Sequence, residues 1–148
     1  MNIAGILATK GGELITVRPD QPVREALALL ARHNIGALIV VDPGGRPAGV
    51  LSERDIVREA ARNDSVFGTP VGEIMTRDVI TGLAGDDLAA VAHTMTEKRI
   101  RHLPVMDKGR LLGVVSIGDV LKAQRDQYRG EADTLQTMIL NTEAGRSR

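Results

Sequence analysis

Apolar residues in the first half of the chain follow first a helical and then a strand pattern. The helical pattern places apolar side chains at i, i+3, i+4 and i+7, which is typical of one buried helix face: Val23, Ala26, Leu27 and Leu30. Residues 37–41 form a nearly continuous apolar run, which predicts a strand covered on both faces. A turn rich in glycine and proline follows, and residues 47–51 then predict a second strand paired with the first.

Shorter patterns flank these elements. Residues 3–9 predict a short amphipathic turn or helix, and residues 14–17 predict a short strand before Pro19. Ser52 is expected to open a further helix that ends near residues 63–64. The side chains expected on the inner face of that helix are Ile56, Val57 and Ala60.

The same order of elements returns in the second half. Four segments correspond in pairs: 3–7 with 71–75, 14–16 with the expected strand 79–81, 23–30 with 88–95, and 38–42 with 103–107. Identical residues stand at eleven matched positions: Ile15/Ile80, Thr16/Thr81, Ile35/Ile100, Leu38/Leu103, Val40/Val105, Asp42/Asp107, Gly44/Gly109, Gly49/Gly113, Val50/Val114, Ser52/Ser116 and Asp55/Asp119. The chain therefore contains a β-α-β-β-α unit twice.

Duplication has a physical reason, because one unit cannot cover the apolar face of its own small sheet. Two units packed around a pseudo-twofold axis would bury the remainder and leave clefts between them. We therefore predict an α+β fold of two packed repeats followed by a C-terminal helix. The expected division is residues 1–66 and 67–124 for the repeats and 125–148 for a helical extension with a frayed tail.

The C-terminal segment leaves the repeat pattern after Asp119. Apolar residues from Val120 to Ile139 predict a helix to about residue 141 that packs on a partner subunit or back on the repeats. Gly130 is expected to break or bend this helix, since glycine costs about 1 kcal/mol relative to alanine in a helix interior. Residues 143–148 are expected to be frayed.

Composition narrows the class of protein. Hydrophobic residues make up 43% of the 148 residues, which suffices for a core, and with one Phe, one Tyr and no Trp that core is aliphatic. Nineteen basic residues balance nineteen acidic ones, which argues against a nucleic-acid partner. The chain has no cysteine, no signal-peptide pattern and no run long enough to cross a membrane. We expect a soluble, cytoplasmic protein without a membrane partner.

The candidate chemistry lies in a stretch that occurs twice, residues 49–55 and 113–119. In each copy a strand ends at a glycine and two apolar residues, a serine follows, and an aspartate stands three residues later: Ser52 with Asp55, and Ser116 with Asp119. The free N–H groups of a helix start suit a phosphate, and the carboxylate could accept hydrogen bonds from a sugar diol. A simple capping box gives the same pattern, but its recurrence in both halves favours a binding role.

With the repeat described, the chain resembles a tandem pair of cystathionine-β-synthase (CBS) domains, also called a Bateman module. The resemblance covers residues 3–122. It rests on the duplicated serine–aspartate stretch and on two further phrases, Ile74-Met75-Thr76 and Arg101-His102-Leu103-Pro104-Val105.

The resemblance implies binding of adenosine-containing ligands, namely AMP, ADP, ATP and sometimes NAD or S-adenosylmethionine, in the clefts of the pair. It implies that Asp55 and Asp119 bind ribose hydroxyls and that Ser52 and Ser116 approach phosphate or ribose. Adenine would be framed by Thr16 and Thr81 and by the backbone of Gly36, Ala37, Leu38, His102, Leu103 and Pro104. Phosphate charge would be met by Arg54, Arg99 and Arg101.

The two copies are not equivalent. Arg54 in the first stretch corresponds to Gly118 in the second, and Gly36-Ala37 corresponds to Arg101-His102. The two clefts are therefore expected to prefer different ligands, or one of them to stay empty. For the apolar run 103–105 a plain core role stays open, and for Arg99 and Arg101 a plain surface role does. A metal site is not expected from three scattered histidines.

The leading hypothesis is a stand-alone regulatory module that binds an adenine nucleotide and signals to an unknown partner protein in trans. The alternative is a structural module that dimerises through its helices and binds no nucleotide. An enzyme is not expected, because the chain shows no nucleophile–base arrangement, metal cluster or Walker-type loop. No catalytic residue or catalytic cofactor is assigned, and a homodimer is expected.

Overall fold

The computed structural model describes the backbone of residues 1–10 and 14–146 and the side chains of these residues up to Leu140. The first half contains, in order, α1 (Ile3–Lys10), β1 (Thr16–Val17), α2 (Val23–His33), β2 (Ala37–Val41), β3 (Pro47–Ser52) and α3 (Glu53–Ala60). A 3-10 turn, η1 (Val66–Gly68), follows. The second half contains α4 (Val71–Ile74), β4 (Gly82–Leu83), α5 (Leu88–Lys98), β5 (His102–Asp107), β6 (Arg110–Ser116) and α6 (Ile117–Arg146).

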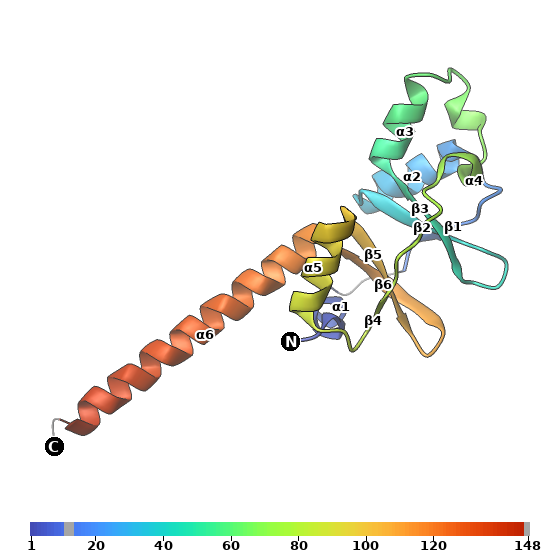
Figure 1. The fold of residues 1–148 in the computed structure, drawn as a ribbon. Coiled ribbons are helices and arrows are strands. Elements are labelled where there is room, and N and C mark those ends of the chain that lie inside the picture. The colour runs from blue at the N-terminus through green and yellow to red at the C-terminus, as the bar shows by residue number, and fades with distance from the viewer. Residues whose placement is uncertain (11–13, 147–148) are drawn as a thin grey trace.

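Each half forms a three-stranded sheet of the same topology, in the orders β1-β2-β3 and β4-β5-β6. In each sheet the first two strands are parallel, and the second and third form an antiparallel hairpin. At the open end of the hairpin, Ala37 pairs with Ser52 in the first half, and His102 pairs with Ser116 at the corresponding positions of the second half. The residues of β2 are almost all buried, as expected for a strand covered on both faces. The predicted α+β fold of two repeats is confirmed (Figure 1).

The two halves exchange their leading helices. Ile3 and Ile6 of α1 are buried in the core of the second half, while Val71 of α4 is buried in the core of the first half. Backbone hydrogen bonds fix both crossings, from the Ile3 N–H to the Asp86 carbonyl at 3.1 Å and from the Val71 N–H to the Gln21 carbonyl at 2.8 Å. Each core therefore includes a helix from the other half, and neither core is complete without it.

Two local predictions were wrong. The strand expected at 79–81 begins later, at Gly82, which pairs with Val105. In the first half Thr16 pairs with Ile39, but the residue that would correspondingly face Thr81 is Pro104, which has no N–H to donate in a sheet. In α3 only Ile56 is buried, whereas Val57 is 68% exposed and Ala60 is exposed, because this helix presents a single narrow face to the core.

Gly49 is required by the close approach of the segment that connects the halves. Thr76 pairs with Val50 of β3 through two backbone hydrogen bonds of 2.9 and 3.0 Å. A Cβ atom on Gly49 would lie 2.8 Å from the Thr76 carbonyl oxygen and closer still to the Met75 side chain. Backbone at that distance cannot move without breaking the pairing, which accounts for a glycine at this position.

Gly49→Ala is therefore expected to destabilise the protein by about 1–3 kcal/mol, the usual cost of overpacking. Urea unfolding followed by circular dichroism measures the change. Gly130→Ala is the matched control: a Cβ there meets nothing within 4 Å, and alanine favours the helix, so its stability should be unchanged or higher. Equal stability of Gly49→Ala and the unmodified protein would contradict the packing argument.

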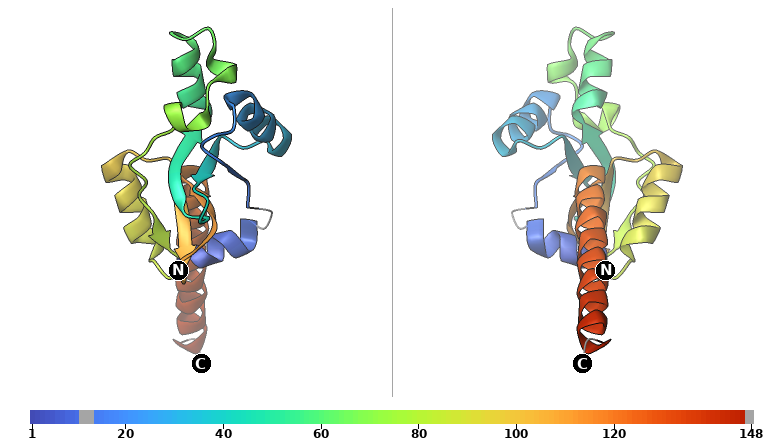
Figure 2. Two further views of the ribbon diagram at one scale, coloured as in Figure 1. Left: turned by 90° about the vertical axis from the view of Figure 1, so that its right-hand side faces the viewer. Right: turned by 90° about the vertical axis from the view of Figure 1, so that its left-hand side faces the viewer.

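The C-terminal helix differs from the expectation in three ways. It is continuous through Gly130, it extends to Arg146 rather than residue 141, and it does not pack back on the repeats. Only its first turns are anchored, by Val120 and Ala123 in the second core, and every side chain from Arg125 to Leu140 is exposed. Figures 1 and 2 show α6 projecting away from the rest of the molecule. A single exposed glycine costs too little to interrupt so long a helix. Of the tail expected to fray, residues 143–146 are helical and residues 147–148 lie outside the described part.

Candidate functional site

Both serine–aspartate corners form where a strand passes directly into a helix. At the end of β3 the Asp55 N–H donates to Ser52 Oγ at 3.2 Å, and the Ser52 N–H donates to Asp55 Oδ2 at 2.9 Å. The second corner repeats this geometry, with 3.0 Å from the Asp119 N–H to Ser116 Oγ and 2.9 Å from the Ser116 N–H to Asp119 Oδ2. Both corners are thus capping boxes. Capping engages one carboxylate oxygen, so it does not exclude ligand binding by the other.

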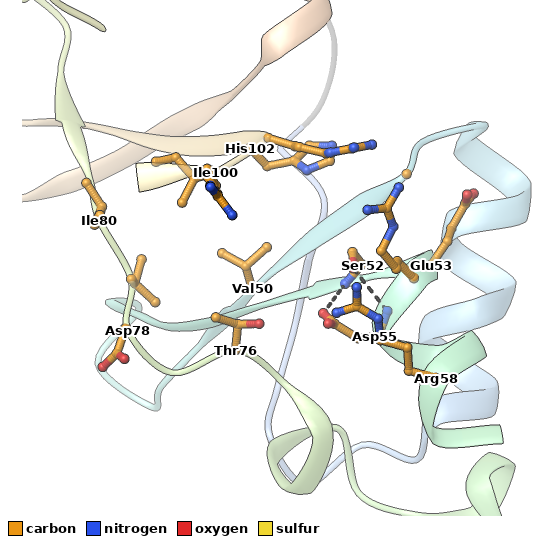
Figure 3. A pocket seen from close by; sticks show the side chains of 15 residues that line it. Val50, Ser52, Glu53, Asp55, Arg58, Thr76, Asp78, Ile80, Ile100 and His102 are labelled. Atoms are coloured by element: carbon orange, nitrogen blue, oxygen red, sulfur yellow. Dashed lines mark hydrogen bonds between the residues drawn. The ribbon is translucent and has the colours of Figure 1, made fainter. Parts of the chain in front are cut away.

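A cavity of about 430 Å³ opens beside the first corner, between the two halves (Figure 3). Several predicted ligand residues line this first cleft: Gly36, Ser52, Arg54 and Asp55 from the first half, and Arg99, Arg101 and His102 from the second. Among the described residues, nothing but the Ser52 N–H engages the Asp55 carboxylate. The first cleft therefore presents an available carboxylate.

Four arginines line the first cleft: Arg54, Arg58, Arg99 and Arg101. None of the ion pairs in the described part of the chain involves any of them. Arg99 also caps the C-terminus of α5 with a φ of 55°, a left-handed conformation that asparagine or glycine adopts more readily. Unpaired guanidinium groups at one cavity are suited to an anion, because arginine pairs with phosphate through two parallel hydrogen bonds.

Sequence reasoning missed several residues of the first cleft. Arg58 lies one helical turn after Arg54, so the i, i+4 spacing could have revealed it. The connecting segment adds Thr76, Asp78 and Ile80, which the sequence gives no reason to place opposite the first corner. Its position follows from the pairing of Thr76 with Val50.

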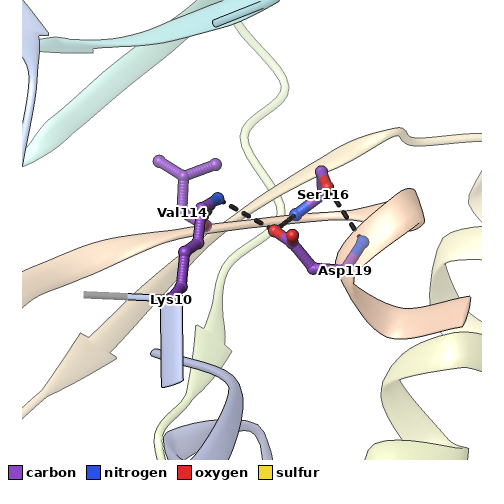
Figure 4. Close-up of polar contacts among 4 residues, drawn as sticks. All are labelled: Lys10, Val114, Ser116 and Asp119. Atoms are coloured by element: carbon purple, nitrogen blue, oxygen red, sulfur yellow. Dashed lines mark hydrogen bonds and ion pairs between the residues drawn. The ribbon is translucent and has the colours of Figure 1, made fainter. Parts of the chain in front are cut away.

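A second cavity, of about 530 Å³, lies beside the second corner. Four predicted ligand residues line this second cleft: Gly36, Ala37, His102 and Ser116. Asp119 does not line this cleft. Its carboxylate is paired with Lys10, whose ammonium donates to Asp119 Oδ2 at 2.8 Å and to the Val114 carbonyl at 3.1 Å (Figure 4). Burial alone would raise the pKa of Asp119, but the hydrogen bonds from Lys10 and Ser116 outweigh it and hold that pKa below its ordinary value. The second carboxylate is therefore ionised and already paired.

His102 lines both clefts, and its ring lies close to Gly36 across the contact between the halves. Burial lowers the pKa of His102, because the charged imidazolium loses hydration there. Four nearby charged groups also act on it: Lys10 and Arg101 lower the pKa further, while Asp119 and Glu53 oppose them. His102 is therefore neutral at pH 7.

This shift makes stability depend on pH. The folded protein disfavours protonated His102, so below the ordinary pKa of 6.5 the unfolded chain binds more protons and stability falls with decreasing pH. His102→Gln is expected to lose less stability than the unmodified protein between pH 7.5 and pH 5, as measured by urea unfolding at both values. The exposed His93→Gln is the control. An unchanged pH dependence in His102→Gln would contradict the expectation.

Other predicted residues do not lie in the clefts. Leu38 and Leu103 are buried in the two cores. Pro104 is also buried, on the opposite face of β5 from Leu103, because successive side chains of a strand point to opposite faces. Any role of these three would rest on backbone atoms. Thr81 lines a separate cavity of about 320 Å³ with Arg46 and Met106, while Thr16 and Gly118 line none of these three cavities.

Two further observations bear on chemistry. Within the described residues, no group of three or more His, Asp or Glu side chains could hold a metal ion. None of the helices in that part of the chain is sufficiently long and apolar to span a membrane.

The fold and its clefts define a class of protein: two intertwined α+β repeats with a ligand-sized cavity beside each serine–aspartate corner. A family model described as the CBS domain matches residues 6–62 and again residues 71–126. The chain therefore belongs to the CBS domain family and carries the domain twice.

Relatives and solved structures agree with this assignment. The mitochondrial CBS domain-containing protein CBSX3 of Arabidopsis thaliana is 35% identical over 146 residues, which cover 93% of this chain and 71% of the relative. The CBS-domain protein ATU1752 of Agrobacterium tumefaciens has a crystal structure with a TM-score of 0.77 and 36% identity, covering 84% of this chain and 99% of that one. The CBS domain pair of protein MJ0100, in complex with 5′-methylthioadenosine and S-adenosyl-L-methionine, gives a TM-score of 0.76 at 30% identity and covers 86% of this chain and 98% of that one.

Proposed function

We propose that this protein is a regulatory CBS pair that binds a phosphorylated adenosine ligand, such as AMP, ADP, ATP or NAD, in the first cleft and signals to a partner protein. The observation that carries the proposal is the group of four unpaired arginines beside the available Asp55 carboxylate. A carboxylate next to guanidinium groups matches a ribose next to phosphate.

The first cleft has chemically distinct ends. Figure 3 shows Val50, Ile80 and Ile100 toward one end, with Thr76 and Asp78 beside them, and Ser52, Asp55 and Arg58 toward the other. Aliphatic side chains suit the flat, weakly polar face of adenine, and the polar end suits ribose and phosphate. A volume of about 430 Å³ lies within the range of pockets for small ligands. These features support a nucleotide bound with its base toward the aliphatic end.

Charge distinguishes among adenosine ligands. The ligands bound by MJ0100 share an adenosine group, but S-adenosyl-L-methionine carries a sulfonium cation. Four arginines line the first cleft of this chain against three carboxylates, Glu53, Asp55 and Asp78, so the lining has a positive net charge that favours phosphates over a cation. We therefore expect phosphorylated ligands to bind here more tightly than S-adenosyl-L-methionine.

A ligand that touches both halves provides a route to regulation. Residues of the first cleft come from the first half, the connecting segment and the second half. Binding would favour one relative orientation of the halves, and a partner could read that orientation. The identity of the partner, the cytoplasmic location and the absence of catalysis stay predictions. Recovery of unchanged nucleotide after incubation with the protein tests the last of these.

A thermal-shift screen tests the proposed function. The ligands are AMP, ADP, ATP, NAD, NADH and S-adenosyl-L-methionine, with adenine and ribose 5-phosphate as fragments. A ligand at 100 times its dissociation constant should add about 2.7 kcal/mol of stability if it binds the folded state alone. Stabilisation by phosphorylated ligands and little by either fragment is expected. No stabilisation by any of them would refute nucleotide binding.

A dimerisation role is the second candidate, and α6 supports it. Leu121, Tyr128 and Leu135 recur every seven residues on α6, Ile139 follows one turn later, and all four are exposed. A coiled coil has two apolar positions in every seven residues: Leu121, Tyr128 and Leu135 supply one, and Ala132 and Ile139 fall at the other. Most helical stability in proteins comes from packing of such an apolar face. The second copy that would cover this stripe is the α6 helix of another chain.

Leu135→Glu is expected to abolish self-association through α6, because it places a charge in the middle of the apolar stripe. Sedimentation velocity measures the change from dimer to monomer. Gln136→Glu, one residue away and off the stripe, introduces the same charge and should leave the dimer intact. A monomeric unmodified protein, or a dimer unaffected by Leu135→Glu, would contradict this role.

A further inference from the structure

The two serine–aspartate corners share their capping geometry but differ in the charged groups that contact the aspartate carboxylate. The helix that approaches the second corner, α1, has eight residues and ends at Lys10. Its counterpart near the first corner, α4, has four residues and ends at Ile74. The longer helix carries an ammonium group onto Asp119, whereas no cation of the described residues pairs with Asp55.

The contact of Lys10 is specific. Its ammonium makes two hydrogen bonds, to Asp119 Oδ2 and to the Val114 carbonyl, and the same Oδ2 accepts the Ser116 N–H. The Asp119 side chain is 26% exposed and that of Lys10 is 42% exposed, so the pair is partly sheltered from water. Asp119 Oδ2 thus accepts two hydrogen bonds while Oδ1 stays open, so a ribose diol that donates one hydrogen bond to each carboxylate oxygen would have to displace the ammonium group.

The rest of the second cleft offers little to an anionic ligand. Its described lining includes one cation, Lys10, together with neutral His102 and mostly aliphatic side chains. The four arginines that line the first cleft are absent from this lining. A nucleotide would therefore lose its ribose acceptor here without gaining a group of arginines for its phosphates.

We propose that Lys10 acts as an internal counter-ion that occupies the ribose position of the second cleft, so that the chain binds one adenosine ligand, in the first cleft. This inference rests on the proposed function of the first cleft and explains why two clefts with the same corner would not fill equally. Removal of the Lys10 charge should release Asp119 as a ribose acceptor and create a second binding site.

Equilibrium dialysis of the full chain with AMP and, separately, adenosine tests this proposal. Adenosine carries the ribose without phosphate and so reports on the carboxylate corner alone. We expect one molecule per unmodified chain. In Lys10→Ala and Lys10→Gln we expect a second bound molecule per chain. Adenosine should bind the second cleft of these variants about tenfold more tightly, or more, than it binds that cleft in the unmodified protein. Adding Asp119→Asn to Lys10→Ala should remove the new site. Lys122→Ala, an exposed lysine on α6, is the charge-matched control and should still bind one molecule.

The outcomes separate this inference from the proposed function. Two molecules per unmodified chain, with one lost in Asp119→Asn, would overturn the role of Lys10 while leaving nucleotide binding intact. A single bound molecule per chain in both Lys10 variants would also overturn the role of Lys10 and leave nucleotide binding intact. No binding in any form of the protein would remove the proposed function and this inference with it. Because Lys10 lies on the surface end of α1, its variants are expected to fold, and far-ultraviolet circular dichroism checks this.

Discussion

Asp55→Asn is expected to weaken nucleotide binding in the first cleft by about 30-fold or more. Hydrogen bonds to a charged group contribute about 1.5–3 kcal/mol each, and the proposed ribose diol would donate two to this carboxylate. Asparagine keeps a carbonyl oxygen that can accept the Ser52 N–H, so the capping of α3 should survive. The substitution thus removes the charge without removing the corner.

Isothermal titration calorimetry with AMP or ATP measures this loss. Asp107→Asn makes the same chemical change at the exposed C-terminal end of β5, at a residue that lines neither cleft, and should bind as the unmodified protein does. Urea unfolding of both variants separates lost binding from lost folding. Unchanged affinity in Asp55→Asn would show that the first carboxylate acts only as a helix cap.

Ile3→Ala is expected to destabilise the protein by about 2–5 kcal/mol, the range for removing a large buried aliphatic side chain. Ile3 is fully buried, although it is the third residue of the chain, because α1 completes the core of the second half. Ile3 packs closely on β4, where a Cβ on Gly82 would lie 3.3 Å from Ile3 Cδ1, so its truncation leaves a cavity between α1 and β4. An effect of this size would be a large part of the stability of a domain.

Urea unfolding also measures this effect, and the chain offers a matched pair for comparison. Val71→Ala removes the corresponding buried side chain from the first core, and Val57→Ala makes the same change at an exposed position. Val71→Ala should be clearly destabilising, and Val57→Ala should change stability by less than about 0.5 kcal/mol. If Ile3→Ala were as mild as Val57→Ala, α1 would not be part of the second core.

Most of the fold could be predicted from the sequence because the same β-α-β-β-α pattern occurs in both halves. Ser52 with Asp55 and Ser116 with Asp119 identify both strand-to-helix corners, since a capping box needs nothing beyond its own four residues. The buried strand β2 was equally clear from its continuous apolar run. Such features are local, and local patterns are what a sequence records most directly.

Features that depend on distant contacts were not predictable in the same way. Lys10 and Asp119 are 109 positions apart, and no local pattern indicates that α1 crosses to the other half. The late start of β4 depends on which residue Pro104 faces, and the exposure of Val57 depends on how α3 is rotated on its sheet. Arg58 is different, because its spacing from Arg54 was visible and its role in the cleft could have been inferred.

The position of α6 has a mechanical consequence. The helix starts at the residue after Ser116, so its first turn contains the Asp119 corner, and its remaining length extends beyond the repeats. Thirty residues at 1.5 Å each make a rod of about 45 Å. A rotation of about 5° at its base would displace its tip by about 4 Å, as follows from that length. A small rearrangement beside Lys10 would thus be amplified, as by a lever, into a movement large enough for another protein to detect.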